Sequence, residues 1–225
     1  MKPAVIFDMD GVLVDSFEAH RDAWMNMIQS EKMPLDPAQF TAVFGRTSRE
    51  VIAHLCGANR YTETEIKTMD HQRECAYRDS IRARFPAMPG ARELITSLSR
   101  DGFALALGSS GPPENAELVL EKLGVRHLFG AVVTGRDVCK GKPDPEVFLV
   151  AASRLGVSPN VCAVIEDAPA GIAAANTCGM ISIGLASIGR THQALANARL
   201  VVDSLQELSP ALIQQLIASP QKNSY

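Results

Sequence analysis

The chain has 225 residues, of which 46% are hydrophobic and 21% charged, proportions typical of a globular protein. Its formal net charge of −3 offers no long-range attraction for nucleic acid or an anionic membrane. No apolar run approaches the roughly 20 residues of a membrane helix, and the N-terminus does not resemble a signal peptide. The five cysteines form no CxxC or Cys/His cluster, so neither a zinc site nor a disulfide framework is indicated. We therefore expect a cytoplasmic protein without nucleic-acid or membrane partners.

Short apolar runs without polar alternation predict buried parallel strands. These runs are residues 4–7, 104–107, 131–134, 161–165, 181–185 and 200–202. Helical patterns lie between most of them, for example at 91–98, at 146–155 after Pro145, and at 170–178 before Gly179. Strands that alternate with helices predict a doubly wound, Rossmann-like parallel α/β sheet.

One long stretch, residues 16–85, shows helical periodicity and no convincing strand. Ala23, Trp24, Met27 and Ile28 form an apolar stripe, and residues 63–84 form a polar-rich helical segment. This insertion after the first strand is too long for a loop. The sequence therefore predicts a helical domain at 16–85 and an α/β core at 1–15 and 86–225.

The densest chemical motif directly follows the first strand and contains Asp8, Asp10 and Gly11. In a doubly wound fold, ligands bind beyond the carboxyl ends of the strands. Two carboxylates this close repel each other, so either one holds a proton or a cation neutralises them. Such a pair suits phosphoryl transfer, with one carboxylate as nucleophile and the other as general acid and base. The alternative is that these acidic residues merely end a strand and begin a turn.

Three further polar motifs follow later strands. Ser109 and Ser110 lie in a Gly-Ser-Ser-Gly loop whose hydroxyl and N–H groups suit phosphate oxygens, although such loops are often plain turns. Lys142 precedes a proline and can offset negative charge, although most Lys-Pro pairs are solvated. Glu166 and Asp167 suit a Mg²⁺ site, although Asp167 also fits a helix N-cap. Their order at consecutive strand ends favours the functional interpretation.

These four motifs resemble those of haloacid dehalogenase superfamily phosphohydrolases, in the subfamily that includes β-phosphoglucomutase. The resemblance covers nearly the whole chain. It implies that Asp8 is the nucleophile, Asp10 the general acid and base, and Ser109 and Lys142 the residues of the second and third motifs. It also implies that Mg²⁺ is bound by Asp8, the backbone carbonyl of Asp10, and Asp167 with help from Glu166. Asp10 argues against true dehalogenase activity, because dehalogenases lack the second aspartate.

The resemblance further implies that the helical insertion is a cap that closes over the site and selects the substrate. His20 and Trp24 resemble a His-x-x-Ala-Trp segment of sugar phosphatases and mutases, and Arg49 resembles the cap arginine that holds the non-transferring phosphate in the mutase. The second serine, Ser110, joins them as a predicted substrate-binding residue. Core packing remains open for Trp24, and a core or surface role for His20. Arg73 aligns only loosely with a second cationic cap residue, and an exposed helix position remains open for it.

The chain departs from the mutase after Ser109, where Gly111, Pro112 and Pro113 replace a Ser-Lys-Asn segment. Because a mutase needs two phosphate sites, this departure favours a Mg²⁺-dependent phosphatase of a small metabolite, such as a sugar phosphate. The alternatives are a β-phosphoglucomutase-type mutase and a catalytically idle binding protein. A monomer or a small homo-oligomer is compatible with the sequence.

Overall fold

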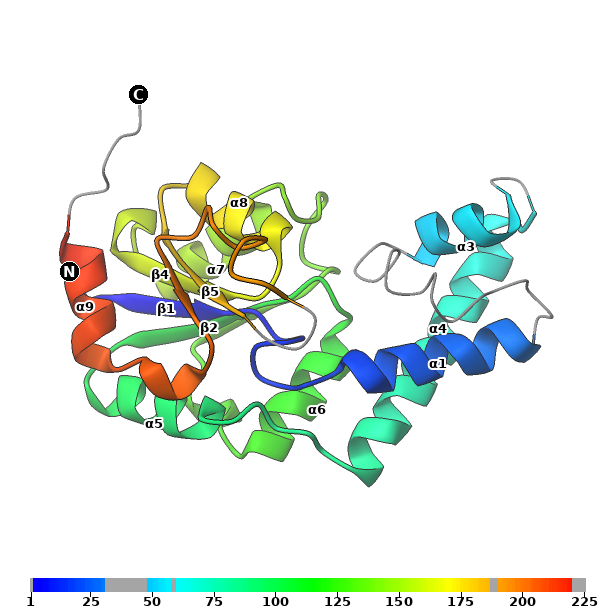
Figure 1. The fold of residues 1–225 in the computed structure, drawn as a ribbon, viewed down its shortest axis with the longest axis horizontal. Coiled ribbons are helices and arrows are strands. Elements are labelled where there is room, and N and C mark those ends of the chain that lie inside the picture. Colours follow the sequence, from blue (N-terminus) through cyan, green and yellow to red (C-terminus); the bar gives the residue numbers. More distant parts are fainter. Residues whose placement is uncertain (1, 31–47, 58–59, 187–189, 220–225) are drawn as a thin grey trace. The chain divides into compact units, whose positions relative to one another are not determined.

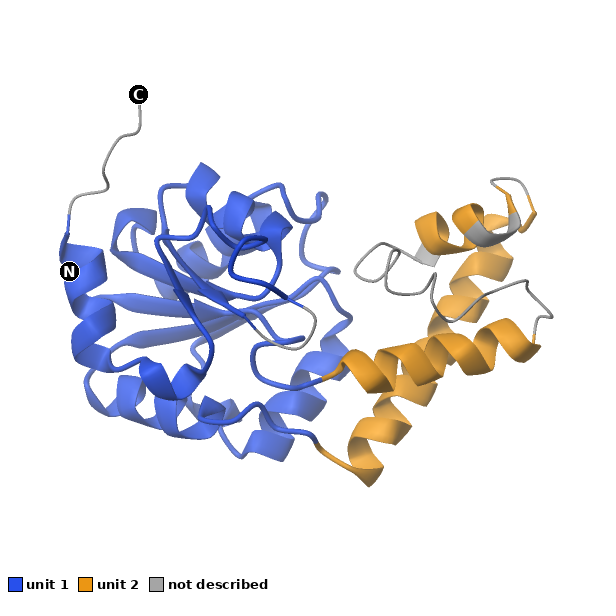
Figure 2. Ribbon diagram, viewed as in Figure 1, with its two compact units in different colours: residues 1–15, 86–225 blue, residues 16–85 orange. Residues whose placement is uncertain are grey.

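The structure is a computed structural model, and it describes residues 2–30, 48–57, 60–186 and 190–219. The chain divides into two compact units, shown in Figure 2. Unit 1 comprises Met1–Asp15 and Pro86–Tyr225, and unit 2 comprises Ser16–Phe85.

Unit 1 is built on a six-stranded parallel sheet with the order β3-β2-β1-β4-β5-β6 (Figure 1). The strands are β1 (Ala4–Phe7), β2 (Ala104–Gly108), β3 (Ala131–Val133), β4 (Cys162–Glu166), β5 (Ile181–Leu185) and β6 (Leu200–Val202). All of β1 is fully buried, as expected for a central strand covered on both faces. The predicted doubly wound α/β core is confirmed, with strand ends that differ from the predicted ends by at most one residue.

Helices cover both faces of the sheet (Figure 1). One face carries α5 (Ala91–Arg100), α6 (Pro113–Leu123) and α9 (Pro210–Ala218), and the other carries α7 (Glu146–Leu155) and α8 (Pro169–Thr177). Three short 3₁₀ turns complete the described part of unit 1: Arg126–Leu128, Pro159–Val161 and Leu205–Glu207. Small side chains let α7 and α8 pack closely on the sheet, for example Ala151 on α7 and Ala174 on α8.

The chain order of the strands reverses beside β1, which pairs with β2 on one side and with β4 on the other. Such a switch point opens a crevice beyond the carboxyl ends of the strands, and ligands bind there in doubly wound folds. The residues that immediately follow β1, β2 and β4 therefore lie at the expected place for a site.

Unit 2 is the helical insertion between β1 and β2. It contains α1 (Phe17–Ser30), α3 (Ser48–Cys56) and α4 (Glu63–Ala83), and no strand occurs among its described residues. Its apolar core comprises Trp24, Met27, Ile28, Val51, Ile52 and Met69. A capping box starts α4: Glu65 N donates to Thr62 Oγ1 at 3.3 Å, and Thr62 N donates to Glu65 Oε2 at 2.7 Å.

The two chain connections to unit 2 are tied together within unit 1. Asp15 N donates to Pro86 O at 2.9 Å, and Val14 forms an antiparallel bridge with Ala87. None of the helices within the described ranges combines the length and apolar character needed to cross a membrane.

Candidate active site

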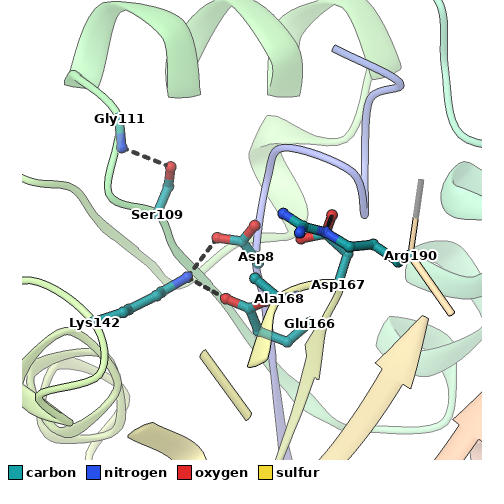
Figure 3. A network of polar contacts seen from close by, with 8 residues as sticks. All are labelled: Asp8, Ser109, Gly111, Lys142, Glu166, Asp167, Ala168 and Arg190. Atoms are coloured by element: carbon teal, nitrogen blue, oxygen red, sulfur yellow. Dashed lines mark hydrogen bonds and ion pairs between the residues drawn. The ribbon is translucent and has the colours of Figure 1, made fainter. Parts of the chain in front are cut away.

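Four polar segments meet at the carboxyl edge of the sheet (Figure 3). Asp8 follows β1, Ser109 follows β2, and Glu166 ends β4, so adjacent parallel strands bring these three residues to one edge. Lys142 reaches the same place from the loop between β3 and α7. The four sequence motifs, far apart along the chain, thus form one cluster.

Lys142 is the centre of this cluster. Its Nζ donates to Asp8 Oδ1 and to Glu166 Oε1, each at 2.6 Å. The side chains of Lys142, Asp8 and Glu166 are only 9%, 11% and 1% exposed. Its ammonium also lies 4.9 Å from the centre of the buried Phe148 ring. One cation therefore holds two carboxylates in a nearly dry environment.

Backbone hydrogen bonds fix the turn after β1, which carries Asp8 and Asp10. Asp8 N donates to Ile165 O at 2.9 Å, which continues the ladder between β1 and β4, and Gly11 N donates to Val14 O at 2.9 Å. Gly11 has a φ of 76°, and a Cβ atom there would lie 2.3 Å from Asp167 Oδ2. Only glycine fits both this backbone conformation and this approach.

The loop after β2 is closed on itself. Ser109 is buried, its N–H donates to Val133 O at 3.0 Å, and its Oγ accepts from Gly111 N at 3.0 Å. A Cβ atom on Gly111 would lie 3.9 Å from Asp10 Oδ2, so this loop and the Asp10 carboxylate are neighbours. Ser110 is exposed. The hydroxyl of Ser109 thus lies near the acidic motif, and it already accepts a hydrogen bond from an N–H of its own loop. Its role in catalysis stays a prediction.

Glu166 and Asp167, at the end of β4, contact different partners. Glu166 Oε1 accepts from Lys142, while its Oε2 accepts from Ala168 N at 2.7 Å. Asp167 Oδ2 lies 3.5 Å from Arg190 Nε, a cation that the sequence reasoning missed because residue 190 lies far from all four motifs along the chain.

Burial and repulsion from neighbouring carboxylates raise the pKa of Asp8 and of Asp167. Burial raises the pKa of Asp8 well above its usual 3.8, with Glu166 and Asp167 adding to the shift and Lys142 opposing it. Burial and the charge of Glu166 likewise raise the pKa of Asp167 to about 7, against the effect of Arg190. Burial alone would lower the pKa of Lys142, but Asp8 and Glu166 outweigh it and raise that pKa above its usual value. Burial and the crowding of carboxyl groups thus disfavour the charged forms of Asp8 and Asp167.

A bound divalent cation would offset the negative charge of these crowded carboxyl groups. Ligand oxygens of Asp8, Glu166 and Asp167 all lie within 4.8 Å of one another. Few carboxylates, all oxygen donors, form the type of ligand set that Mg²⁺ accepts in phosphate-handling sites. The part of Asp10 in metal binding, through its backbone carbonyl, stays a prediction.

The predicted cap residues lie in unit 2. His20 stacks on Tyr77, with ring centroids 4.1 Å apart and an interplanar angle of 12°. Trp24 is buried in the core of unit 2, and the guanidinium of Arg73 lies 5.0 Å from its ring centre. The expected exposed position of Arg73 is wrong, because its side chain is buried against Trp24 and bound by Asp70 and Glu74. Arg49 is exposed and pairs with Glu63, while residues 31–47, which precede it in the chain, lie outside the described residues. Substrate binding by His20, Trp24, Arg49 and Ser110 stays a prediction.

Two more residues that shape the site were missed by the sequence reasoning. Gly171 leaves room for the Glu166 side chain, because a Cβ atom on residue 171 would lie 1.8 Å from Glu166 Oε1. Glu146 binds the backbone of the loop that carries Lys142. Both residues are close in the sequence, but the contact between Glu166 and Gly171 follows only from the way the chain turns into α8.

Comparisons with known proteins agree with this geometry. Residues 2–179 match the haloacid dehalogenase-like hydrolase family. The chain is 34% identical to β-phosphoglucomutase of Bacillus subtilis strain 168 over 94% of each chain. It is also 34% identical to validoxylamine A 7'-phosphate phosphatase of Streptomyces hygroscopicus subsp. limoneus, over 92% of this chain and 96% of the relative. Further relatives are, by name, phosphatases of phosphorylated carbohydrates.

A solved structure extends the likeness to the whole fold. The crystal structure of β-phosphoglucomutase from Clostridium difficile superimposes with a TM-score of 0.85 and 29% sequence identity, over 96% of this chain and 97% of that one. In this fold, the helices between β1 and β2 form a cap. With its family match, its four motifs and its capped α/β core, the chain belongs to the haloacid dehalogenase-like hydrolases, in the subfamily of β-phosphoglucomutase and sugar phosphatases.

Proposed function

We propose that the protein is a Mg²⁺-dependent phosphatase of a small phosphorylated metabolite, a sugar phosphate, and that Asp8 carries the phosphoryl group. The observation that carries this proposal is the buried contact of Lys142 with both Asp8 and Glu166. A carboxylate that is desolvated, oriented and partly neutralised is suited to attack a phosphorus atom that already bears negative charge.

In the first step, an Asp8 oxygen forms a bond to phosphorus while the bond from phosphorus to the sugar oxygen breaks. Asp10, in its acid form, gives its proton to the departing oxygen, so the sugar leaves as a neutral alcohol. Lys142 offsets negative charge on Asp8 and on the transferred group, and the Ser109 hydroxyl supports a phosphate oxygen.

In the second step, Asp10 is a carboxylate and takes a proton from water while the water oxygen attacks phosphorus. The acyl-phosphate bond breaks, inorganic phosphate leaves, and Asp8 returns as a carboxylate. Proton release and uptake by Asp10 balance over the cycle. Asp8 thus carries the phosphoryl group and Asp10 moves the proton in both steps, so no further base is needed.

Asp8, Asp167 and Glu166, with the Asp10 carbonyl, would hold Mg²⁺. When bound, the ion supplies positive charge that stabilises the transferred phosphoryl group. This charge would oppose the effects of burial and of the neighbouring carboxylates, which raise the pKa of Asp8 and Asp167.

A phosphatase is favoured over a mutase by the loop after Ser109. Gly111, Pro112 and Pro113 contribute no side-chain hydrogen-bond donor there, and two of the three are prolines without an N–H. A mutase must bind two phosphates and reorient a bisphosphate, whereas a phosphatase needs one phosphate site. The mutase remains the second candidate, because a mutase and a phosphatase resemble the chain at the same 34% identity.

We also propose that unit 2 acts as the cap that closes over the site and selects the substrate. His20 and Arg49 are the predicted contacts to the sugar and its second polar group. Exclusion of water by such a cap would strengthen the charge interactions around Asp8.

The test is a panel of sugar phosphates, phosphoglycolate and nucleotides, assayed for phosphate release with and without Mg²⁺. We expect one group of sugar phosphates to stand out, with loss of turnover without Mg²⁺ and in Asp8→Asn. Conversion of β-glucose 1-phosphate to glucose 6-phosphate with little free phosphate would favour the mutase instead. Undiminished turnover in Asp8→Asn would exclude the proposed nucleophile.

A further inference from the structure

Lys142 depends on an irregular loop for its placement. The segment between β3 and α7, residues 134–145, has no regular helix or strand of its own. The lysine side chain has a flexible four-carbon stem, and holding it in one rotamer costs conformational entropy. The two 2.6 Å contacts of its ammonium therefore require a backbone that is held in place near residue 142.

Glu146, the first residue of α7, holds that backbone. Its Oε2 accepts hydrogen bonds from Cys139 N at 3.1 Å and from Lys140 N at 2.8 Å. One carboxylate oxygen thus fixes two successive peptide units, two and three residues before Lys142.

Two further hydrogen bonds hold the part of this loop that follows Lys142. Asp144 N donates to Gly141 O at 3.0 Å, and Asp144 Oδ1 accepts from Glu146 N at 3.1 Å. Lys142 therefore lies between two tied points, the peptides bound by Glu146 and the turn that enters α7. Phe148, one turn into α7 measured from Pro145, lies under the lysine ammonium.

We propose that Glu146 is a positioning residue for Lys142: by tying peptides 139 and 140 to the first turn of α7, it holds the lysine in register with Asp8 and Glu166. This inference rests on the proposed catalytic role of Lys142. Both hydrogen bonds join backbone donors to a charged acceptor, and both are exposed to water, so each contributes less than a shielded bond of this kind. Their loss frees the loop without removing any group that touches substrate.

The first test compares kcat and KM of Glu146→Ala, Glu146→Gln and Glu93→Ala. Glu93 is an exposed first-turn glutamate on α5, so its variant controls for loss of a negative charge at a helix N-terminus. Since displacement of a catalytic group by about 1 Å lowers rates by up to about 100-fold, we expect Glu146→Ala to lose 10- to 100-fold in kcat with little change in KM. Glu146→Gln keeps an acceptor oxygen and should recover most of this loss.

The Lys142→Ala background separates positioning from general structural damage. With the lysine absent, Glu146→Ala should change kcat by less than about 2-fold, because residues that act through one another are not additive. An equal loss in both backgrounds would overturn the proposal. Should Glu146→Ala not fold, Glu146→Asp, which is too short to reach both N–H groups, takes its place in the same comparison.

A second readout does not depend on activity. Acetylation of the metal-free protein by a water-soluble ester is followed by peptide mass spectrometry, with Lys140 as the internal reference, because its side chain is 74% exposed and that of Lys142 is 9% exposed. Loss of about 1.4 kcal/mol of local stability should raise the acetylation of Lys142 relative to Lys140 about 10-fold in Glu146→Ala. No rise would refute the positioning role. Absence of phosphatase activity in the wild-type protein would refute the proposed function but leave this comparison valid.

Discussion

Glu166 occupies the space that a side chain on residue 171 would need. A Cβ atom on Gly171 would lie 1.8 Å from Glu166 Oε1 and 2.0 Å from its Cδ. The glutamate cannot simply swing aside, because it is buried and bound by Lys142 Nζ and Ala168 N. Gly171, in the first turn of α8, thus leaves the space that the Glu166 carboxylate occupies.

Gly171→Ala should therefore act through Glu166. We expect the added methyl to displace the carboxylate, weaken Mg²⁺ binding and lower kcat/KM about 10- to 100-fold, the loss found when partners of metal ligands are disturbed. Isothermal titration with Mg²⁺ and steady-state kinetics measure both effects.

The Glu166→Ala background provides the control for this substitution. There the methyl on residue 171 enters empty space, so its additional effect on Mg²⁺ affinity should be within about 2-fold. The same large loss in both backgrounds would show that the methyl perturbs α8 itself rather than Glu166.

Lys142→Ala should lower both activity and stability. Removing the cation leaves the carboxylates of Asp8 and Glu166 buried together, and breaking such a buried ion pair costs about 3–5 kcal/mol. Loss of charge stabilisation should reduce kcat by at least about 100-fold. Lys140→Ala removes an exposed lysine two residues away, so it is the control in both the chemical denaturation and the kinetic measurements. Wild-type kcat in Lys142→Ala would contradict the assigned role.

Asp137→Asn should reveal a pH-dependent contribution to stability. The hydrogen bonds from Arg154 and Thr134 lower the pKa of Asp137 from 3.8 to about 2, so folding favours its charged form. This contribution is fully present above about pH 5 and is lost as the pH falls toward 2. Because the side chains of Asp137 and Arg154 are 27% and 42% exposed, we expect only about 1 kcal/mol. Urea unfolding at pH 7 and pH 3 measures the difference, which should shrink at the lower pH; an unchanged difference would rule out this explanation.

Trp24→Phe distinguishes the two interpretations of this cap residue. Trp24 is 5% exposed within the core of unit 2, which favours packing. A phenyl ring keeps most of that packing, so we expect a stability loss of about 1–2 kcal/mol and a KM within about 2-fold of wild type. A KM increase above 10-fold without loss of stability would instead indicate direct substrate contact.

The sequence predicted the fold and the meeting of the four motifs for a clear physical reason. Buried parallel strands such as 4–7 and 181–185 are continuous apolar runs, and the polar residues directly after them must lie at one edge of the sheet. Asp8, Ser109 and Glu166 could be placed together from that rule, whereas Lys142 lies in the long loop between β3 and α7 and is not covered by it.

Contacts that depend on side-chain length and loop path could not be predicted in this way. Glu146 looked like an ordinary acidic residue in the first turn of a helix, which is favourable for the helix dipole alone. Its bonds to Cys139 N and Lys140 N arise only once the preceding loop turns back on α7. Arg190 was missed for the same reason, because its approach to Asp167 crosses from β5 to β4.

The central claim, phosphoryl transfer to Asp8, is tested most directly with Asp10→Asn and an activated ester, 4-nitrophenyl phosphate. This leaving group departs as an anion and needs no proton, so the first step can proceed without Asp10, while water is not activated for the second. We predict a rapid release of one equivalent of nitrophenol per active site, followed by a stall, with the phosphoryl group found on Asp8 by mass spectrometry after an acid quench. Steady turnover without such a burst, or label on another residue, would contradict the mechanism.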